Sequence, residues 1–281
     1  GARAAIRTAA WFCRRKPLGA AGALIVLALL VTTLFAERIA PYSYDEPIAG
    51  ARLHAPSLAF PLGTDNVSRD ILSRIVYGAR VSVTVGFATV LLGTLAAAAI
   101  GITSGYFRGR YDMVVQRIVD AWQSFPYLVI ILSLLAVLGP GLLNTILALS
   151  ILTAAAASRV IRSATLAVVE TPYVEAARAI GGTHLRLMVR HIFPNVAPTI
   201  IILATIALGG VILAESALSF LGYGVPPPYP SWGSMLSGSG RTYMYKAPWM
   251  AIWPGVAISL AVFGFNMLGD ALRDVLDPRL R

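Results

Sequence analysis

The sequence has very few cysteines, histidines and charged side chains. Its 281 residues include one cysteine and three histidines, and only 13% are charged, against about 25% in typical soluble proteins. Cys13 cannot form a disulfide within the chain, and the distant His54, His184 and His191 cannot complete a zinc site with it. Disulfide scaffolds, zinc sites and dithiol redox enzymes are therefore excluded, and we expect no metal site.

The sequence is instead rich in long apolar runs. Hydrophobic residues make up 57% of the chain and recur in stretches long enough to cross a bilayer as helices. The first stretch, 18–36, is longer than the core of about 7–15 residues in a cleaved signal peptide, so we expect a retained span. We predict an all-α membrane protein with six spans, at residues 18–36, 81–106, 113–138, 142–161, 196–221 and 249–268.

The net charge of +10 is informative once it is divided among the loops. With the N-terminus inside, fifteen lysines and arginines fall in inner segments, seven in outer segments, and Arg117 within a span. Because basic residues favour the cytoplasmic side, both termini are predicted to be cytoplasmic, and a nucleic-acid surface is not needed to explain the charge. Residues 1–17 and 271–281 are then cytoplasmic ends, 37–79 an extracytoplasmic loop, and 80–270 the transmembrane core with an inner loop at 162–195.

The inner loop contains a short helix with both ends marked. Thr171 can cap its free amides, Pro172 suits the first helical position, and Gly181 provides a left-handed stop. About nine residues are too few for a helix that is stable alone, so a partner surface is expected. Thr183 can cap a second helix, which Pro194 is predicted to break before the fifth span.

Within this loop, Glu175-Ala176-Ala177, then Gly181, then His191-Ile192-Phe193-Pro194 resemble the EAA loop of bacterial ABC-importer permeases. Phe193 departs from the leucine usual before the proline. Further blocks resemble the C-type inner-membrane permeases of dipeptide and oligopeptide importers, in the same order along the chain. They are Leu62-Gly63-Thr64-Asp65, Arg69-Asp70, Tyr77-Gly78-Ala79-Arg80, Ala214-Glu215-Ser216-Ala217-Leu218-Ser219, Pro230-Ser231-Trp232-Gly233 and Leu276-Asp277-Pro278-Arg279.

This resemblance implies a type I ABC-importer permease fold in the bacterial inner membrane, and a transport subunit that is not itself an enzyme. It implies a heterodimer with a homologous permease, two cytoplasmic ATPase subunits or domains and an extracytoplasmic binding protein. No G-x-x-x-x-G-K-[ST] loop occurs, so ATP and Mg²⁺ are expected on the ATPases and no cofactor in this chain. The implied ATPase-docking residues are Glu175, Ala176, Ala177, Gly181 and Pro194.

The same branch transports peptides or nickel, and the scattered histidines make peptide the better expectation. Charges inside spans leave other questions open, because each costs about 2.5–3.5 kcal/mol at the bilayer centre. Asp120 is expected to pair with Arg117 on one helical face. Glu215, beside Ser216 and Ser219, either lines the translocation path or bonds neighbouring helices. A proton-coupled secondary transporter using Asp120 and Glu215 as relays is the alternative from another class.

Aromatic residues gather on the expected outer side of the last two spans. This pattern is typical of an interfacial belt, although a docking surface for a binding protein is a sharper alternative. The residues are Tyr223, Tyr229, Trp232, Tyr243, Tyr245 and Trp249.

Overall fold

The computed structural model describes residues 16–276. Expectations that involve residues 1–15 or 277–281, such as the basic Arg14 and Arg15 or the acidic Asp277, lie outside this range. All regular structure within the described range is helical. The helices are α2 (Pro17–Leu34), α3 (Ala36–Ile39), α4 (Ile71–Phe107), α5 (Gly109–Gln123), α6 (Tyr127–Leu138), α7 (Leu142–Val169), α8 (Pro172–Ala179), α9 (His184–Arg186), the π-helix η1 (Leu187–Ile192), α10 (Phe193–Phe220), α11 (Trp232–Leu236), α12 (Ser239–Thr242) and α13 (Trp249–Leu276).

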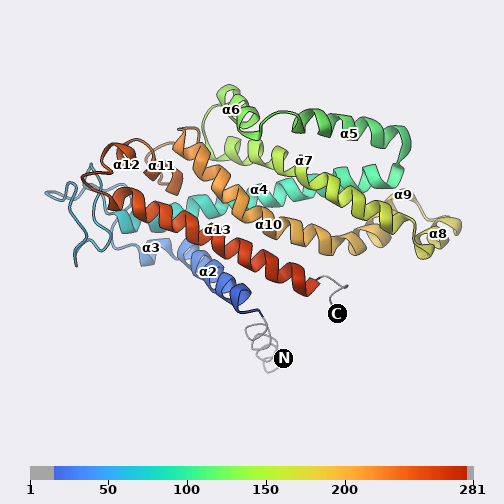
Figure 1. Ribbon diagram of the computed structural model, residues 1–281, viewed down its shortest axis with the longest axis horizontal. Coiled ribbons are helices and arrows are strands. Elements are labelled where there is room, and N and C mark those ends of the chain that lie inside the picture. The colour runs from blue at the N-terminus through green and yellow to red at the C-terminus, as the bar shows by residue number, and fades with distance from the viewer. Residues whose placement is uncertain (1–15, 277–281) are drawn as a thin grey trace.

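Five helices, α2, α4, α7, α10 and α13, are long and apolar enough to cross a membrane. They correspond to five of the six predicted spans and confirm the all-α membrane class. Helices α8 and α9 lie at one end of the molecule, which we call the loop end (Figure 1). Residues 40–70, α11 and α12 lie at the opposite end, which we call the cap end.

The predicted third span, 113–138, is not one straight helix. It is divided into α5 and α6, which meet at an angle of 89°. The break falls at Ser124–Pro126, because Pro126 has no amide hydrogen for the helix and its ring disfavours helical geometry at Phe125. Residues 16–276 therefore hold five candidate spans, or six when the bent pair is taken as one.

Helices α4 and α7 run parallel and pack with very little space between them. Small residues recur on α4 every fourth position, at Gly93, Ala97, Gly101 and Gly105. A Cβ at Gly101 would lie 2.7 Å from the carbonyl oxygen of Ser158. Such stripes let helices approach closely where lipid removes the usual hydrophobic drive for association.

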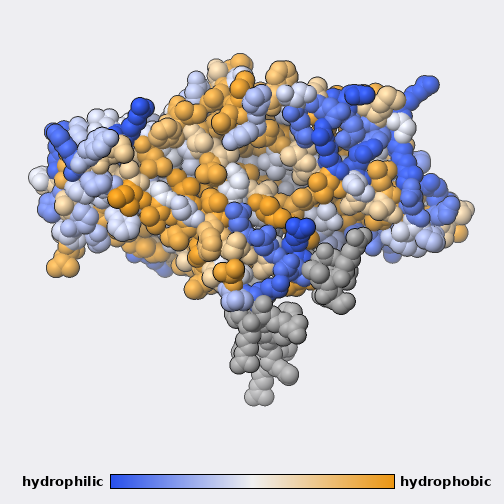
Figure 2. Space-filling view, viewed as in Figure 1, coloured by the Kyte–Doolittle hydropathy of each residue, from blue (hydrophilic) through white to orange (hydrophobic). Residues whose placement is uncertain are grey.

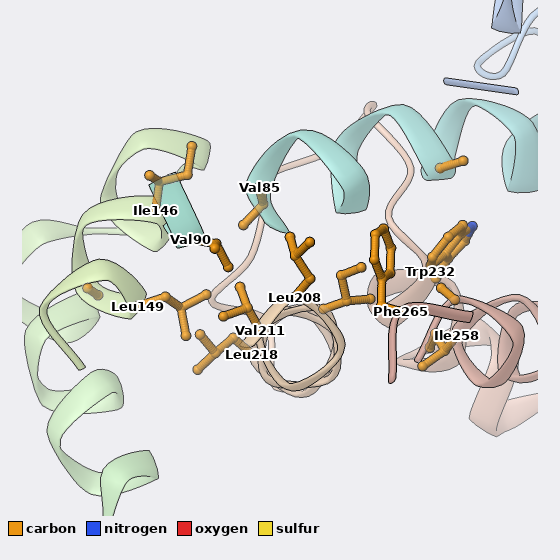
Figure 3. Packing of buried hydrophobic residues seen from close by; sticks show 14 of the residues in the cluster. Val85, Val90, Ile146, Leu149, Leu208, Val211, Leu218, Trp232, Ile258 and Phe265 are labelled. Carbon is orange, nitrogen blue, oxygen red and sulfur yellow. The ribbon is translucent and has the colours of Figure 1, made fainter. Parts of the chain in front are cut away.

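Helix α10 lies at the centre of the main hydrophobic core. Figure 3 shows Leu208, Val211 and Leu218 of α10 between Leu149 of α7 and Phe265 of α13. A second cluster near the loop end joins α4, α7 and the start of the α10 segment. Its buried members are Ala97, Ala98, Ile102, Tyr106, Ile161, Val169, Leu187, Ile192 and Val196.

The surface between the two ends is largely apolar. Figure 2 shows hydrophobic residues across the middle of the molecule and hydrophilic residues gathered toward both ends, with a further hydrophilic group at the lower edge of the middle. Leu24 and Leu27 of α2 and Leu91 of α4 each expose more than half of their surface. Exposed leucines in such number are expected where lipid is the solvent.

Two helix boundaries differ from those predicted. Pro194 does not break the path into the fifth span, because the helix continues from His184 to Phe220 through η1. There the amide of Phe193 donates to the carbonyl of Met188, five residues back, and this wider turn accommodates the proline. The outer segment is also shorter than expected, since α4 begins at Ile71, where Asp70 accepts a hydrogen bond from the Ser73 amide at 2.7 Å.

The prediction that Trp232 belongs to an interfacial belt is wrong. Its side chain is buried, and Nε1 donates to the carbonyl of Ile75 at 3.0 Å. Trp249 similarly donates to the carbonyl of Thr64 at 3.1 Å. These indoles join α11 and α13 to the start of α4 and to the cap, so they hold the cap end together.

Candidate functional site

Helix α8 has the predicted position, start and C-terminal stop, but it lacks the predicted side-chain cap. Pro172 is the first helical residue, whereas the Thr171 hydroxyl donates to the Val168 carbonyl and does not cap the helix. At the other end Gly181 has φ +84°. The amide of Gly182 donates to the Ala177 carbonyl and that of Gly181 to the Arg178 carbonyl. These two bonds form a Schellman stop, which needs a residue that tolerates positive φ.

One face of α8 is attached to the body and the other is exposed. Val174 is fully buried, and Ala177 packs against the second hydrophobic cluster. Glu175 and Ala176 point to the exposed side, and Ile180 at the helix end is 88% exposed. Within the described residues, Glu175 makes no side-chain hydrogen bond or ion pair, so its carboxylate is free for a partner.

The attachment of α8 extends to α4 through a contact that sequence analysis missed. The hydroxyl of Tyr106, near the end of α4, lies 2.7 Å from Nδ1 of His184. The guanidinium carbon of Arg178 lies 5.6 Å from the centre of the Tyr106 ring. Both α8, through Arg178, and α9, through His184, are therefore in contact with the end of α4. No sequence motif links positions this far apart, so only the fold reveals the contact.

Pro194 lies apart from α8. It is the second residue of α10, and its side chain is exposed. The predicted docking set is therefore divided: residues 175–181 share one short helix and its stop, while Pro194 follows the wide turn of η1 that connects this region to the long α10.

The expected ion pair between Arg117 and Asp120 is present but long, at 3.9 Å, and its arginine is 80% exposed. The nearer partner of Asp120 is Arg159 of α7. Asp112 of α5 similarly binds Arg162 of α7 and the Ser104 hydroxyl of α4. The acids of α5 thus bridge helices, which helical periodicity within α5 alone could not predict.

Glu215 lies in the closed contact between α10 and α4. Its side chain has 0% exposure and accepts hydrogen bonds from the hydroxyls of Ser82, at 2.9 Å, and Ser219, at 2.7 Å. Ser216 is buried beside it, with no hydrogen bond to its hydroxyl in the described structure. This geometry favours the bonding of neighbouring helices over a position on an open path.

Replacing Glu215 with alanine is expected to lower the free energy of unfolding by about 3 kcal/mol, because it opens a cavity and leaves the Ser82 hydroxyl without its partner. The matched Glu215→Gln variant keeps the size and the oxygen acceptor, and it is expected to retain most stability and transport. Thermal unfolding in detergent and uptake in cells measure the two effects. Normal stability with abolished uptake in Glu215→Gln would show that the charge itself is needed for translocation.

Ser219, one of the three residues predicted to line a path, borders a cavity. This cavity of about 510 Å³ lies at the cap end. We call it the cap cavity. No group of three or more histidine, cysteine or acidic side chains able to hold a metal ion is present in residues 16–276.

Residues 87–281 match the family described as the binding-protein-dependent transport system inner membrane component. The matched range includes α8, its stop and Glu215. The chain belongs to this family. As an inner-membrane component it is a multi-pass protein of the type I ABC-importer permease class, which agrees with its five long helices and one bent pair.

Relatives of this permease match almost its whole length. It is 38% identical to the dipeptide transport system permease protein DppC of Alkalihalophilus pseudofirmus, over 95% of this chain and 88% of the relative. It is also 38% identical to the glutathione transport system permease protein GsiD of Escherichia coli, with the same coverage. The MetNI methionine ABC transporter, in an inward-facing conformation, has a similar fold, with a TM-score of 0.58 over 73% of this chain and 96% of that chain at 19% identity.

Proposed function

We propose that this permease is the C-type subunit of an ATP-driven importer for dipeptides or oligopeptides. In this proposal α8 is the coupling helix that docks on a cytoplasmic ATPase. The main support for this proposal is that α8 has one anchored face and one exposed face. Within the described residues Glu175 is exposed and unpaired, whereas Val174 is buried and Ala177 packs against the second hydrophobic cluster. ATP and Mg²⁺ are bound by the ATPases, and this chain supplies the mechanical link.

The direction of transport and the partners follow from the same assignment. The loop end is then cytoplasmic, as the excess of inner lysines and arginines predicts, and the cap end faces an extracytoplasmic binding protein. One chain supplies half of the pathway and a homologous permease supplies the other half. The exposed apolar surfaces of α5, α6 and α7 are available to that partner or to lipid.

A proton-coupled transporter is less well supported than an importer subunit. Its two candidate relays would be Asp120 and Glu215, yet Asp120 is paired with Arg159 and Glu215 is enclosed between α10 and α4. Peptide is favoured over nickel as the substrate because relatives at 38% identity are named for dipeptide and glutathione transport. His54 also lies at the cap end, away from His184 and His191 at the loop end.

Uptake and co-purification test the proposal together. A strain without this chain is expected to lose uptake of labelled alanyl-phenylalanine and to regain it when the chain is restored, while nickel uptake stays unchanged. The tagged chain is expected to co-purify from mild detergent with a second permease and an ATPase. Restoration of nickel uptake instead would favour the nickel branch, and transport by the chain without any ATPase would refute the importer assignment.

A further inference from the structure

Three charged side chains line the cap cavity. Asp65, Arg69 and Arg74 all line it, so two guanidinium groups face one carboxylate. The Asp65 carboxylate is already well satisfied. It accepts from the amides of Val67 and Arg69 at 2.9 Å and from Nε of Arg69 at 2.8 Å.

Arg74 is the less compensated of the two arginines. Its Nε lies 3.8 Å from the Asp65 carboxylate, which is too long for a hydrogen bond, and its side chain is only 10% exposed. One guanidinium nitrogen donates to the carbonyl of Tyr44 at 2.9 Å. An arginine has five N–H donors in a planar fork, so others remain for a ligand in the cavity. A nearly buried positive charge favours an anionic partner.

The rest of the lining fits a small molecule that is partly polar and partly apolar. Ser219, Ser234, Met235, Met250 and Tyr229 all line the cavity, so polar and apolar residues share its wall. Tyr229 is held in place by stacking on Tyr44, with ring centres 5.7 Å apart. A volume of about 510 Å³ lies within the range of small-molecule sites, roughly 300–1,000 Å³.

The cavity also adjoins the end of α10. Ser219 lies in the last turn of that helix and Gly222 lies two residues beyond its last residue, Phe220, and both line the cavity. The C-terminal end of a helix carries a partial negative charge, which favours a cation. A positive and a partly negative region in one cavity match a zwitterion.

We propose that the cap cavity is a binding site for a short peptide, with Arg74 binding its C-terminal carboxylate. This inference depends on the proposed function as a peptide importer and adds a site within this chain. The peptide's free carboxylate forms charge-assisted hydrogen bonds with Arg74, and its amino group lies toward the end of α10. The site would hold the peptide on the extracytoplasmic side, beside the closed contact of Glu215 with Ser82 and Ser219.

Direct binding to the assembled complex tests the site. The complete permease–ATPase complex is placed in lipid nanodiscs without the binding protein, and the affinities of alanyl-phenylalanine and its C-terminal amide are measured by ligand-observed NMR. The free carboxylate is expected to bind about tenfold more tightly than the amide. Arg74→Gln is expected to weaken binding of the acid to the level of the amide.

Two further variants separate the site from the general stability of the cap. Arg52 also donates to a cap carbonyl, that of Asn66 at 3.1 Å, but does not line the cavity, so Arg52→Gln is expected to keep the tenfold preference. Ser239→Phe fills the cavity from α12 without altering a charge, and it is expected to weaken binding of both the acid and the amide.

The outcomes are distinct from those of the proposed function. If cells take up peptides through the wild-type chain but the complex binds acid and amide equally, the cavity site is refuted and the importer function stands. If Arg74→Gln instead weakens only stimulation of ATP hydrolysis by the binding protein, the cavity receives an acidic segment of that protein and the peptide site is also refuted. If restoring the wild-type chain to the deleted strain does not restore peptide uptake, the proposed function itself is refuted.

Discussion

Replacing Gly101 with leucine is expected to prevent stable packing of α4 on α7. Even a single Cβ at this position would lie 2.7 Å from the Ser158 carbonyl oxygen, 2.8 Å from Cβ of Ile161 and 2.9 Å from the Arg162 amide nitrogen. Two of these atoms are backbone and cannot rotate away, so the helices must separate. Separation would also disturb the second hydrophobic cluster, in which Ile102 and Ile161 are buried.

The expected cost in the free energy of unfolding is about 3 kcal/mol or more, at the upper end of measured overpacking. The amount of monodisperse chain after detergent extraction and the unfolding midpoint by tryptophan fluorescence are the measurements. Gly101→Ala and Gly210→Ala form the matched pair, since the added Cβ clashes at the first position, whereas no atom lies within 4 Å of it at the second and α10 has ordinary helical geometry there. Equal loss in both variants would contradict the close-packing explanation.

Reversing the charge of Glu175 is expected to reduce peptide uptake by about tenfold or more while the chain still inserts and folds. Glu175 is exposed and makes no ion pair within the described residues, so its replacement by lysine removes no internal contact. If Glu175 faces a positive charge on the ATPase, lysine at this position places two like charges together, and this costs several kcal/mol of binding free energy. Uptake, the quantity of chain in the membrane and the amount of co-purified ATPase are the measurements.

Glu170→Lys provides the control at the same end of the molecule. Glu170 is exposed and pairs with Arg108 of its own chain at 3.1 Å, and exposed pairs contribute little stability. We expect uptake close to wild type. If Glu175→Lys transports normally, or fails only because the chain is absent from the membrane, α8 is not the coupling helix.

Much of the architecture was determined by the sequence alone. Lipid imposes a simple requirement, that each span be helical and apolar over about 20 residues, and five predicted spans meet it in the structure. The limits of α8 were also local, because Pro172 and Gly181 act through their own backbone geometry. The block pattern around Glu175 gave the family, to which residues 87–281 then proved to belong.

Tertiary structure decided what depends on contacts between distant residues. Pro194 was expected to end a helix, but the wide turn of η1 accommodates it, and this turn is part of the buried cluster around Leu187 and Ile192. Asp120 was assigned to Arg117 by spacing, whereas Arg159 on another helix approaches more closely.

The surroundings of Glu215 and Arg74 also depend on contacts between residues that are distant in the sequence. Burial of Glu215, the bond between Tyr106 and His184 and the approach of Arg74 to Asp65 all join separate elements of the fold. Side-chain charge and helical period are properties of one segment, and they were enough to predict the membrane location and the position and limits of α8. The desolvation and partners of each charge are properties of several segments together, so only the folded chain could reveal a closed contact at Glu215 and a cavity at Arg74.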